Sequence, residues 1–178
     1  MAKTTFQGPV VSKAGFFNTG PGNVVDAASS VSLTVDTHAG RIVHNDAAGA
    51  VTYTLPATNA NSDSAIAGPG ADLNNLSNVG AKFEIFNSIT KTGDLVVQVA
   101  NATDVMIGSA LFIDDSSDNV VGFETASTSD TITLNGSTTG GLAGTIITCK
   151  AIGANRWGVQ VNTGGTGDAA TPFSAAVS

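Results

Sequence analysis

Few residues of this sequence have side chains and spacings that could support chemistry. A hydrolytic triad needs a nucleophile, a base and an orienting acid, and the only histidines available as the base are His38 and His44. His38 lies in DTHAG, which is typical of a turn, and His44 lies in VHND, which is expected at the end of a strand. The sequence has no G-x-S-x-G nucleophile elbow. We therefore expect both histidines to be structural.

Metal ligands and paired carboxylates are equally sparse. The densest acidic cluster is Asp114, Asp115 and Asp118 in IDDSSDN, and oxygen ligands are those that calcium prefers. The cluster lacks the glycine and the distant glutamate of an EF-hand loop, so a solvated hairpin turn is favoured and a cation site is the alternative. Glu84 and Glu124 are the only glutamates, and nothing marks a glycosidase pair. Two histidines and one cysteine are too few for zinc, and no cofactor is expected.

The remaining reactive or aromatic side chains fit a structural role. Cys149 follows Ile147 and Thr148 in an apolar strand, which predicts a buried and inert thiol. Trp157 is in phase with Val159 and Val161, which favours core packing, and an exposed ring that stacks on a sugar is the alternative. The glycine-rich stretch 136–144 lacks the lysine of a phosphate loop. We expect its glycines to form tight hairpin turns or to admit a neighbouring backbone.

The composition limits the class of protein. A chain of 178 residues fits one domain, with 42% hydrophobic and only 12% charged residues. A surface so poor in charge suits close packing against identical neighbours. The net charge of -7 and the scattered basic residues disfavour nucleic-acid binding. No apolar run is long enough to predict a signal peptide or a membrane span, so we expect neither.

Apolar and polar residues alternate over most of the chain, and this alternation predicts β-strands. The strands are expected around these apolar positions: Val31, Leu33 and Val35; Ile42 and Val43; Val51, Tyr53 and Leu55; Phe83 and Ile85; Leu95, Val97 and Val99; Leu111 and Ile113; Val121 and Phe123; Ile132 and Leu134; Ile147, Cys149 and Ala151; Trp157, Val159 and Val161. No window keeps a helical apolar period. The pattern predicts an all-β fold: a single antiparallel β-sandwich or jelly-roll-like domain of about ten short strands.

Three segments do not show this alternation of apolar and polar residues. Residues 1–22 are rich in Gly and Pro, yet contain several large apolar side chains, which favours an extended N-terminal arm that becomes ordered by docking. Residues 57–80 predict a long surface loop within a β-sandwich domain at 23–162. Residues 163–178 predict a flexible C-terminal tail that Pro172 and Phe173 could anchor to a neighbour.

Several short segments resemble those of phage decoration and fibre proteins. They are TLPA at 54–57, VGAKFEIFN at 79–87, TDVMIG at 103–108, TITLNG at 131–136 and GTIITCKAIGANRWGVQ at 144–160. The opening MAKTTFQGPVVSKAGF resembles the N-terminus of small structural proteins of tailed marine phages. The chain lacks the long repetitive shaft of a fibre protein, so the head decoration, or cement, family is the closer resemblance.

The resemblance implies a virion structural protein without enzymatic activity. It would sit as a homotrimer on the outer capsid surface, with the major capsid protein and itself as partners, after synthesis in the host cytoplasm. No contact with nucleic acid or membrane is expected. The expected capsid or subunit contacts are the apolar side chains of the arm: Phe6, Val10, Val11, Phe16 and Phe17. The alternatives are a head or tail fibre module that recognises host surface glycan and, less favoured, a depolymerase-type enzyme.

Overall fold

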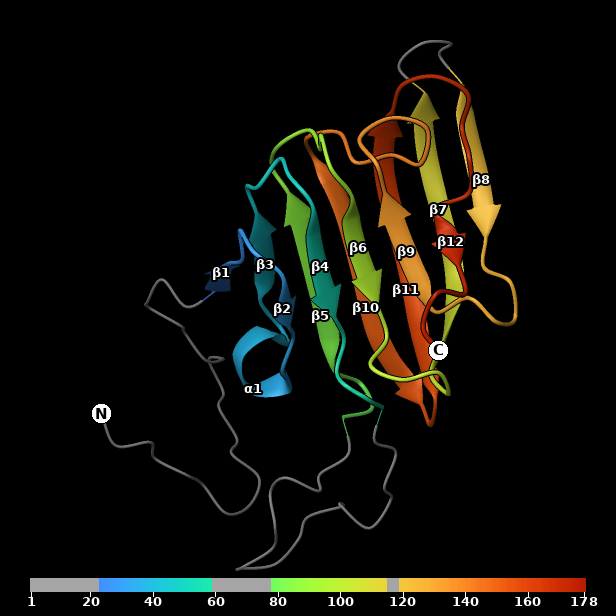
Figure 1. The fold of residues 1–178 in the computed structure, drawn as a ribbon. Helices are drawn as coiled ribbons and strands as arrows, with labels where there is room; N and C mark the ends of the chain where they lie inside the picture. Colours follow the sequence, from blue (N-terminus) through green and yellow to red (C-terminus); the bar gives the residue numbers. More distant parts are fainter. Residues whose placement is uncertain (1–22, 59–77, 115–118) are drawn as a thin grey trace, which may run out of the picture.

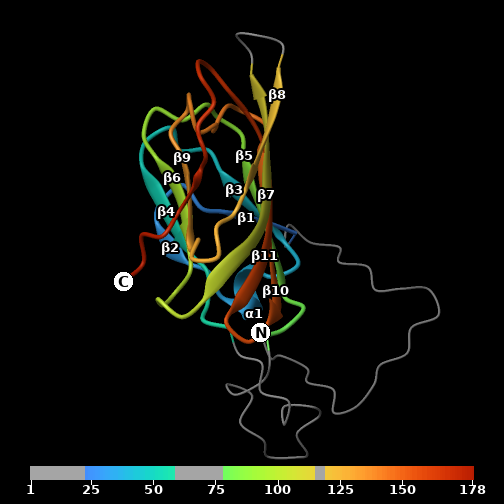
Figure 2. The same ribbon diagram turned by 90° about the vertical axis from the view of Figure 1, so that its right-hand side faces the viewer.

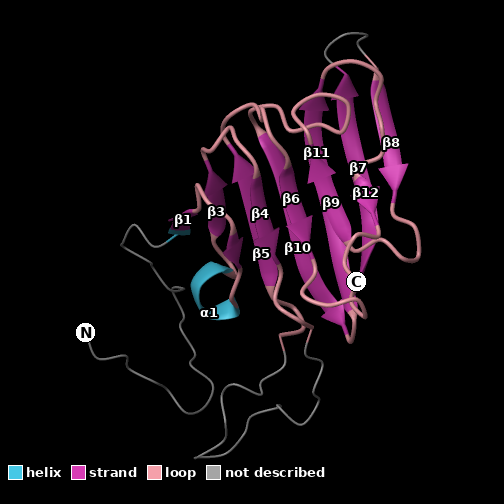
Figure 3. Cartoon of the chain, viewed as in Figure 1, coloured by secondary structure: helices cyan, strands magenta, loops and turns pink. Residues whose placement is uncertain are grey.

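The chain folds into two β-sheets packed face to face. The computed structural model describes residues 23–58, 78–114 and 119–178, and these residues form twelve strands and one short helix (Figure 1). Figure 2 shows the two layers edge on, and Figure 3 shows how little of the described chain is helical. The expectation of an all-β sandwich is confirmed.

The larger layer is a seven-stranded sheet. Its strands, in spatial order, are β1 (Val24–Asp26), β3 (Ile42–Asn45), β5 (Lys82–Asn87), β10 (Thr145–Gly153), β11 (Arg156–Gly165), β7 (Val105–Asp114) and β8 (Val120–Glu124). β1 and β8 are its two lateral edges.

The smaller layer is a five-stranded sheet. Its strands, in spatial order, are β12 (Phe173–Ser174), β9 (Thr131–Leu134), β6 (Leu95–Gln98), β4 (Val51–Thr54) and β2 (Val31–Ser32). Both of its edge strands have only two residues. Such short edges offer little backbone for pairing with another chain.

The strand directions correct the expectation of an antiparallel sandwich. From β1 to β6 the chain crosses from one sheet to the other at every connection, so the strands within each sheet run the same way. β1 pairs parallel with β3 and β3 with β5, while β2 pairs parallel with β4 and β4 with β6. The first half is therefore a flattened coil with one strand of each turn in each layer.

The second half of the chain closes the sheets differently. The hairpin of β10 and β11 inserts between β5 and β7, so β10 is antiparallel to β5 while β11 is parallel to β7. β7 and β8 form an antiparallel pair at the edge. In the smaller sheet β9 pairs antiparallel with both β6 and β12. Both sheets are therefore mixed, and a jelly roll of antiparallel strands is wrong for this chain.

The core lies between the sheets and contains most of the side chains that the alternation predicts. Fully buried members include Tyr53, Phe83, Leu134, Ile147 and Trp157. The Trp157 ring meets that of Phe83 edge to face, with centroids 5.7 Å apart. Trp157 is therefore a core residue, as its phase with the neighbouring valines predicts.

A buried polar cluster joins the ends of β3 and β5 to β4. Asn45 Nδ2 donates a hydrogen bond to Asn87 Oδ1 at 2.6 Å, and the Tyr53 hydroxyl donates to the Ala27 carbonyl directly after β1. Asn87 Nδ2 donates in turn to the Ile89 carbonyl at 2.6 Å. Because the partners satisfy one another, the cluster can be buried without a large desolvation penalty.

β7 presents the opposite face from the one that its sequence predicts. Leu111 and Ile113 are 45% and 55% exposed, whereas Ala110 and Phe112 are buried. The register with β11 decides this, because it sets Ala110 opposite the buried Val161. Alternation alone cannot identify the inward face of a strand that is apolar on both faces.

The prediction of a strand that extends from Val31 to Val35 is wrong beyond residue 32. The structure has β2 at Val31–Ser32 and then a single helical turn, α1 (Val35–His38). The Leu33 amide still bonds to the Thr54 carbonyl at 2.8 Å, but the His38 amide bonds back to Thr34 at 3.0 Å. The helical turn reverses the chain towards β3.

The expected flexible tail is an integral part of the sandwich. Residues 163–165 continue β11, and β12 pairs with β9 through Phe173 opposite Ile132. The buried Asp130 carboxylate accepts hydrogen bonds from the amides of Ala176 at 2.8 Å and Val177 at 3.3 Å. Phe173 packs on its own domain, which supplies the apolar contact that the sequence assigns to a neighbour.

The two ends of the long connection between β4 and β5 are fixed by side chains. Thr58 donates from its amide and its hydroxyl to the buried Asp104 carboxylate, at 2.9 and 2.8 Å. Asn78 Nδ2 donates to the Ala57 carbonyl at 2.8 Å. Residues 59–77, most of the predicted loop, lie outside the described residues, as do residues 1–22 of the predicted arm.

Candidate functional site

An apolar patch covers the outer face of β7 and β8, the face turned away from the smaller sheet. Three large aliphatic side chains of this patch are between 45% and 62% exposed: Leu111, Ile113 and Val120. The register sets Ile113 opposite Val120, so the two side chains lie side by side across the strand pair. Contiguous apolar surface of this kind is typical of a site of interaction.

Among the described residues, no strand pairs with the outer edge of β8 beside the patch. β8 has the sequence VVGFE, in which Glu124 is the only charge and no proline or lysine blocks pairing. Its inward side chains Val121 and Phe123 are only half-buried, and Figure 1 shows β8 at the margin of the larger sheet, beyond β12. Edge strands of monomeric proteins usually carry charges, prolines or bulges that prevent pairing.

A depression of about 660 Å³, which we call the β7 slot, overlaps the patch and lies over the paired strands β7 and β11. It is lined by Leu111, Ile113, Leu142, Ala143, Gly144, Asn162, Thr163 and Gly164. Leu142 overhangs Gly164, since a Cβ atom added there would lie 3.2 Å from Leu142 Cδ1. The absence of a side chain at Gly164 therefore makes room for Leu142, and the slot is lined by three large aliphatic side chains.

Buried hydrogen bonds hold the loop that forms one wall of the slot. The Thr163 hydroxyl accepts a bond from the Gly141 amide at 2.8 Å and lies 2.8 Å from Thr145 Oγ1. The Leu142 amide bonds to the Gly164 carbonyl at 3.2 Å. The wall is thus positioned by β10 and β11, and the slot is preformed.

The glycines of the stretch 136–144 admit neighbouring groups at close range, as the sequence predicts. Gly136 has a φ of +81°, and a Cβ atom there would lie 1.9 Å from the Lys91 carbonyl oxygen. At Gly140 an added Cβ atom would lie 2.4 Å from Thr163 Cγ2. Because of these close contacts, Gly136 and Gly140 have no room for the side chain of any other residue type.

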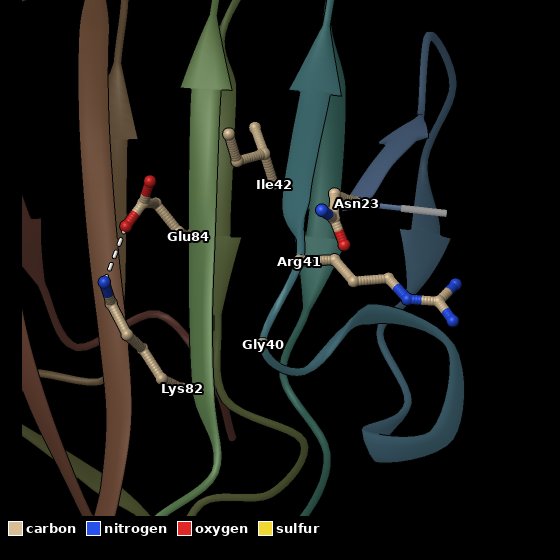
Figure 4. A pocket seen from close by; sticks show the side chains of 6 residues that line it. All are labelled: Asn23, Gly40, Arg41, Ile42, Lys82 and Glu84. Atoms are coloured by element: carbon tan, nitrogen blue, oxygen red, sulfur yellow. Dashed lines mark hydrogen bonds and ion pairs between the residues drawn. The ribbon is translucent and has the colours of Figure 1, made fainter. Parts of the chain in front are cut away.

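A second, smaller depression of about 310 Å³ lies at the opposite end of the same outer face, beside β1 (Figure 4). It is lined by Asn23, Gly40, Arg41, Ile42, Lys82 and Glu84. Lys82 Nζ and Glu84 Oε2 form an ion pair at 2.6 Å, and Figure 4 shows the Arg41 side chain extending away from that pair. The basic groups do not converge on one point, so this depression is a poor anion site.

The structure brings together a serine, a histidine and an aspartate that the sequence does not connect. His44 Nδ1 lies 2.8 Å from Asp26 Oδ1, and His44 Nε2 lies 2.8 Å from Ser88 Oγ. The parallel register of β1 and β3 sets Asp26 opposite His44, and Ser88 directly follows β5. Local sequence carries no signal for this contact, because it depends on pairing between distant strands.

The geometry around Ser88 favours a structural role for this array. The Ser88 amide, which could stabilise an oxyanion, already donates to the Asn45 carbonyl at 2.9 Å. Ser88 Oγ lies 3.2 Å from the same carbonyl, which therefore competes for its proton. Asp26 is 81% exposed, so water screens its interaction with His44. The array joins β1 to β3 and to the end of β5.

His38 and Lys91 also serve the fold. The imidazole Nδ1 of the buried His38 accepts a hydrogen bond from the Thr34 amide at 3.0 Å. The Lys91 ammonium, 3% exposed, donates to the carbonyls of Ala47 and Gly49, and burial lowers the pKa of Lys91. A lysine with a lowered pKa is a candidate nucleophile, but neither described depression is lined by Lys91. Its hydrogen bonds instead join two loops.

Of the other residues that the sequence singles out, Cys149 is fully buried, and burial raises the pKa of its thiol to about 12. The thiol is therefore protonated at neutral pH. In the acidic cluster Asp114 is buried, whereas Asp115 and Asp118 lie outside the described residues. Within the ranges that are described, no group of three His, Cys, Asp or Glu residues could hold a metal ion.

The five predicted contacts of the arm, Phe6, Val10, Val11, Phe16 and Phe17, also lie outside the described residues. In the described part of the chain, no helix has the length and apolarity needed to cross a membrane. Comparison of the sequence and the structure with family models, curated proteins and solved structures finds no match.

Proposed function

We propose that this chain is an assembly protein that acts through binding and not through covalent chemistry. The observation that carries the proposal is the apolar patch on β7 and β8 beside the open β8 edge. The exposed Leu111, Ile113 and Val120 are large aliphatic side chains in a chain of which only 12% is charged. A surface of this kind is stabilised when another protein covers it.

The particular role that we propose is capsid decoration. The protein would bind the outer surface of the assembled phage head as a homotrimer and stabilise it against internal pressure. Support comes from the resemblance of its segments to decoration proteins and from the apolar side chains of residues 1–22. The major capsid protein and further copies of this chain would be its partners.

The physical basis of such stabilisation is mass action. A protein that binds the assembled shell and not its dissociated parts stabilises the shell by about 2.7 kcal/mol per site at a free concentration one hundred times the Kd. Three linked subunits raise the effective affinity further, because each later contact is intramolecular. No catalytic residue is required, and the hydrogen bonds of His38, His44 and Lys91 are consistent with this mechanism.

The competing proposal is a fibre module that binds glycan at the host surface. Such a site would use an exposed aromatic ring, but Trp157 and Tyr53 are both fully buried. Neither can stack on a sugar, so the two aromatic residues with a polar group give this alternative no support.

Copy number distinguishes the two roles. We expect quantitative mass spectrometry of purified virions to give a copy number comparable with that of the major capsid protein. A value comparable with those of the tail proteins would contradict capsid decoration and favour the fibre module. Failure to find the chain in virions would contradict both.

A further inference from the structure

We propose that the β7 slot is the docking site for residues Phe6–Val11 of a second copy of this chain. The inference deepens the self-assembly part of the proposed function, because it names the surface and the segment that join two subunits. It does not depend on whether the assembled protein sits on a capsid.

The shape of the slot suits a short extended segment with bulky apolar side chains. Leu111 and Ile113 line the slot from β7, and Leu142, packed over Gly164, lines it from the loop before β10. The segment FQGPVV offers one aromatic and two β-branched side chains within six residues. An extended segment that contains a proline loses comparatively little conformational entropy when it docks.

The length of the chain before β1 is sufficient for this contact. The described chain begins at Asn23, beside β1, with 22 residues before it. Twelve extended residues, as from Val11 to Asn23, span up to about 40 Å. The segment can therefore reach well beyond the β1 edge of its own subunit.

The positions of donor and acceptor favour a second copy over the same chain. The 22-residue segment leaves the sheet at β1, while the β7 slot lies five strand spacings away, about 24 Å. To reach its own slot, the segment would lie across the polar outward side chains level with Val24 on the intervening strands, namely Glu84, Thr148 and Gln160. Between neighbouring subunits the β1 edge of one can face the slot of the next, a head-to-tail contact that closes into a ring.

Charge favours binding of the leading segment to the domain. Residues 1–22 carry Lys3 and Lys13 and no acidic residue, whereas the remaining residues carry five basic and fourteen acidic side chains. The leading segment is therefore positive and the domain strongly negative. Attraction between them speeds the encounter of two copies that would otherwise repel each other.

Disulfide trapping between two full-length variants tests the proposal. Val10→Cys and Asn162→Cys are made separately, mixed under mild oxidation and analysed by intact mass. Cys149 is buried and protonated, so only the introduced thiols should react. We expect a disulfide-linked heterodimer, in at least about tenfold higher yield than with the control Ser174→Cys, an exposed position on the smaller sheet.

Two further measurements make the test decisive. Adding Ile113→Asp to the Asn162→Cys chain should lower the heterodimer yield about tenfold, because it places a charge on the slot wall. The double variant Val10→Cys/Asn162→Cys, diluted and oxidised, should form little intrachain disulfide. Equal yields with Asn162→Cys and Ser174→Cys, or an intrachain disulfide in place of the heterodimer, would overturn the proposal. A trapped heterodimer with a tail-like copy number would overturn capsid decoration alone.

Discussion

The two edge strands of the seven-stranded sheet, β1 and β8, differ in their contacts and in the side chains that they expose. At the β1 edge a strand of three residues is held by the Asp26–His44 contact, and the Ala27 carbonyl after it accepts the buried Tyr53 hydroxyl. At the β8 edge a strand of five residues exposes Val120 on its outer face and leaves Phe123 half-buried on its inner face. Side chains of the same chain hold the first edge strand to the sheet, and we call it the closed edge; the second, which we call the open edge, exposes apolar side chains that a partner could cover.

Alkaline pH should weaken the closed edge and the core. Burial raises the pKa of Tyr53 and raises that of Cys149 to about 12, so both groups stabilise the fold fully below their unfolded pKa values of 10.0 and 9.0. The contribution of Cys149 is lost as pH rises from 9.0 towards 12, and that of Tyr53 begins to be lost above pH 10.0, each at about 1.4 kcal/mol per pH unit. Lys91 acts oppositely, because its lowered pKa makes deprotonation easier in the folded state.

Urea unfolding at pH 8, 10 and 11 measures this effect. We expect the free energy of unfolding to fall between pH 8 and pH 11, and to fall less steeply in Cys149→Ala. A stability that rises over this interval would mean that Lys91 outweighs the two acidic groups.

Packing beneath the open edge should be intolerant of added volume. A Cβ atom at Gly165 would lie 2.2 Å from both Phe112 Cζ and the Ser137 carbonyl oxygen. We expect Gly165→Ala to destabilise the fold by roughly 2–4 kcal/mol. The matched control is Gly122→Ala on β8, where nothing lies within 4 Å, and its free energy of unfolding should change by less than about 0.5 kcal/mol. Similar losses in the two variants would show that β8 is as tightly packed as the strands beneath it.

A charged side chain at the open edge should weaken self-association without unfolding the domain. We expect Val120→Asp to weaken self-association about tenfold in sedimentation velocity, about 1.4 kcal/mol, while the free energy of unfolding stays nearly unchanged. Ile152→Asp is the control, since Ile152 is 47% exposed near the end of β10 and outside the apolar patch. Equal association by both variants would contradict an interface at β8.

The smallest effect is expected at the Asp26, His44 and Ser88 array. His44→Ala should cost under about 1 kcal/mol, because its aspartate partner is largely exposed, and should speed amide exchange in β1. Ser88→Ala should leave any hydrolysis of a p-nitrophenyl ester at the level of the unaltered chain. Hydrolysis that requires both Ser88 and His44 would show instead that the array is catalytic.

The sequence predicts where the strands lie better than it predicts which strands pair and in which direction. β5, β10 and β11 follow from alternation, because every second side chain of each strand is buried between the sheets. Parallel pairing does not follow, since the register of Asp26 with His44 depends on crossings between the sheets and not on local pattern. The prediction of which face of β7 points inward is also wrong, because both faces of this strand are apolar.

The candidate site is correspondingly harder to predict. Leu142 belongs to a glycine-rich stretch that is correctly predicted to form tight turns, but nothing local indicates that it faces Leu111 across a slot. The slot arises only when β7 pairs with β11. The contacts of Phe6, Val10, Val11, Phe16 and Phe17 stay a prediction.

The parallel pair of β7 and β11 also governs when the fold can form. Val105 pairs with Arg156, so β7 has no partner on that side until a further fifty or so residues have been synthesised. Until then the inward side chains of β7, such as Met106 and Phe112, lack the neighbours that β11 provides in the folded sheet. Contacts so distant in sequence predict slow folding and a period of susceptibility to aggregation, in which chaperones or slower translation should raise the yield of native protein.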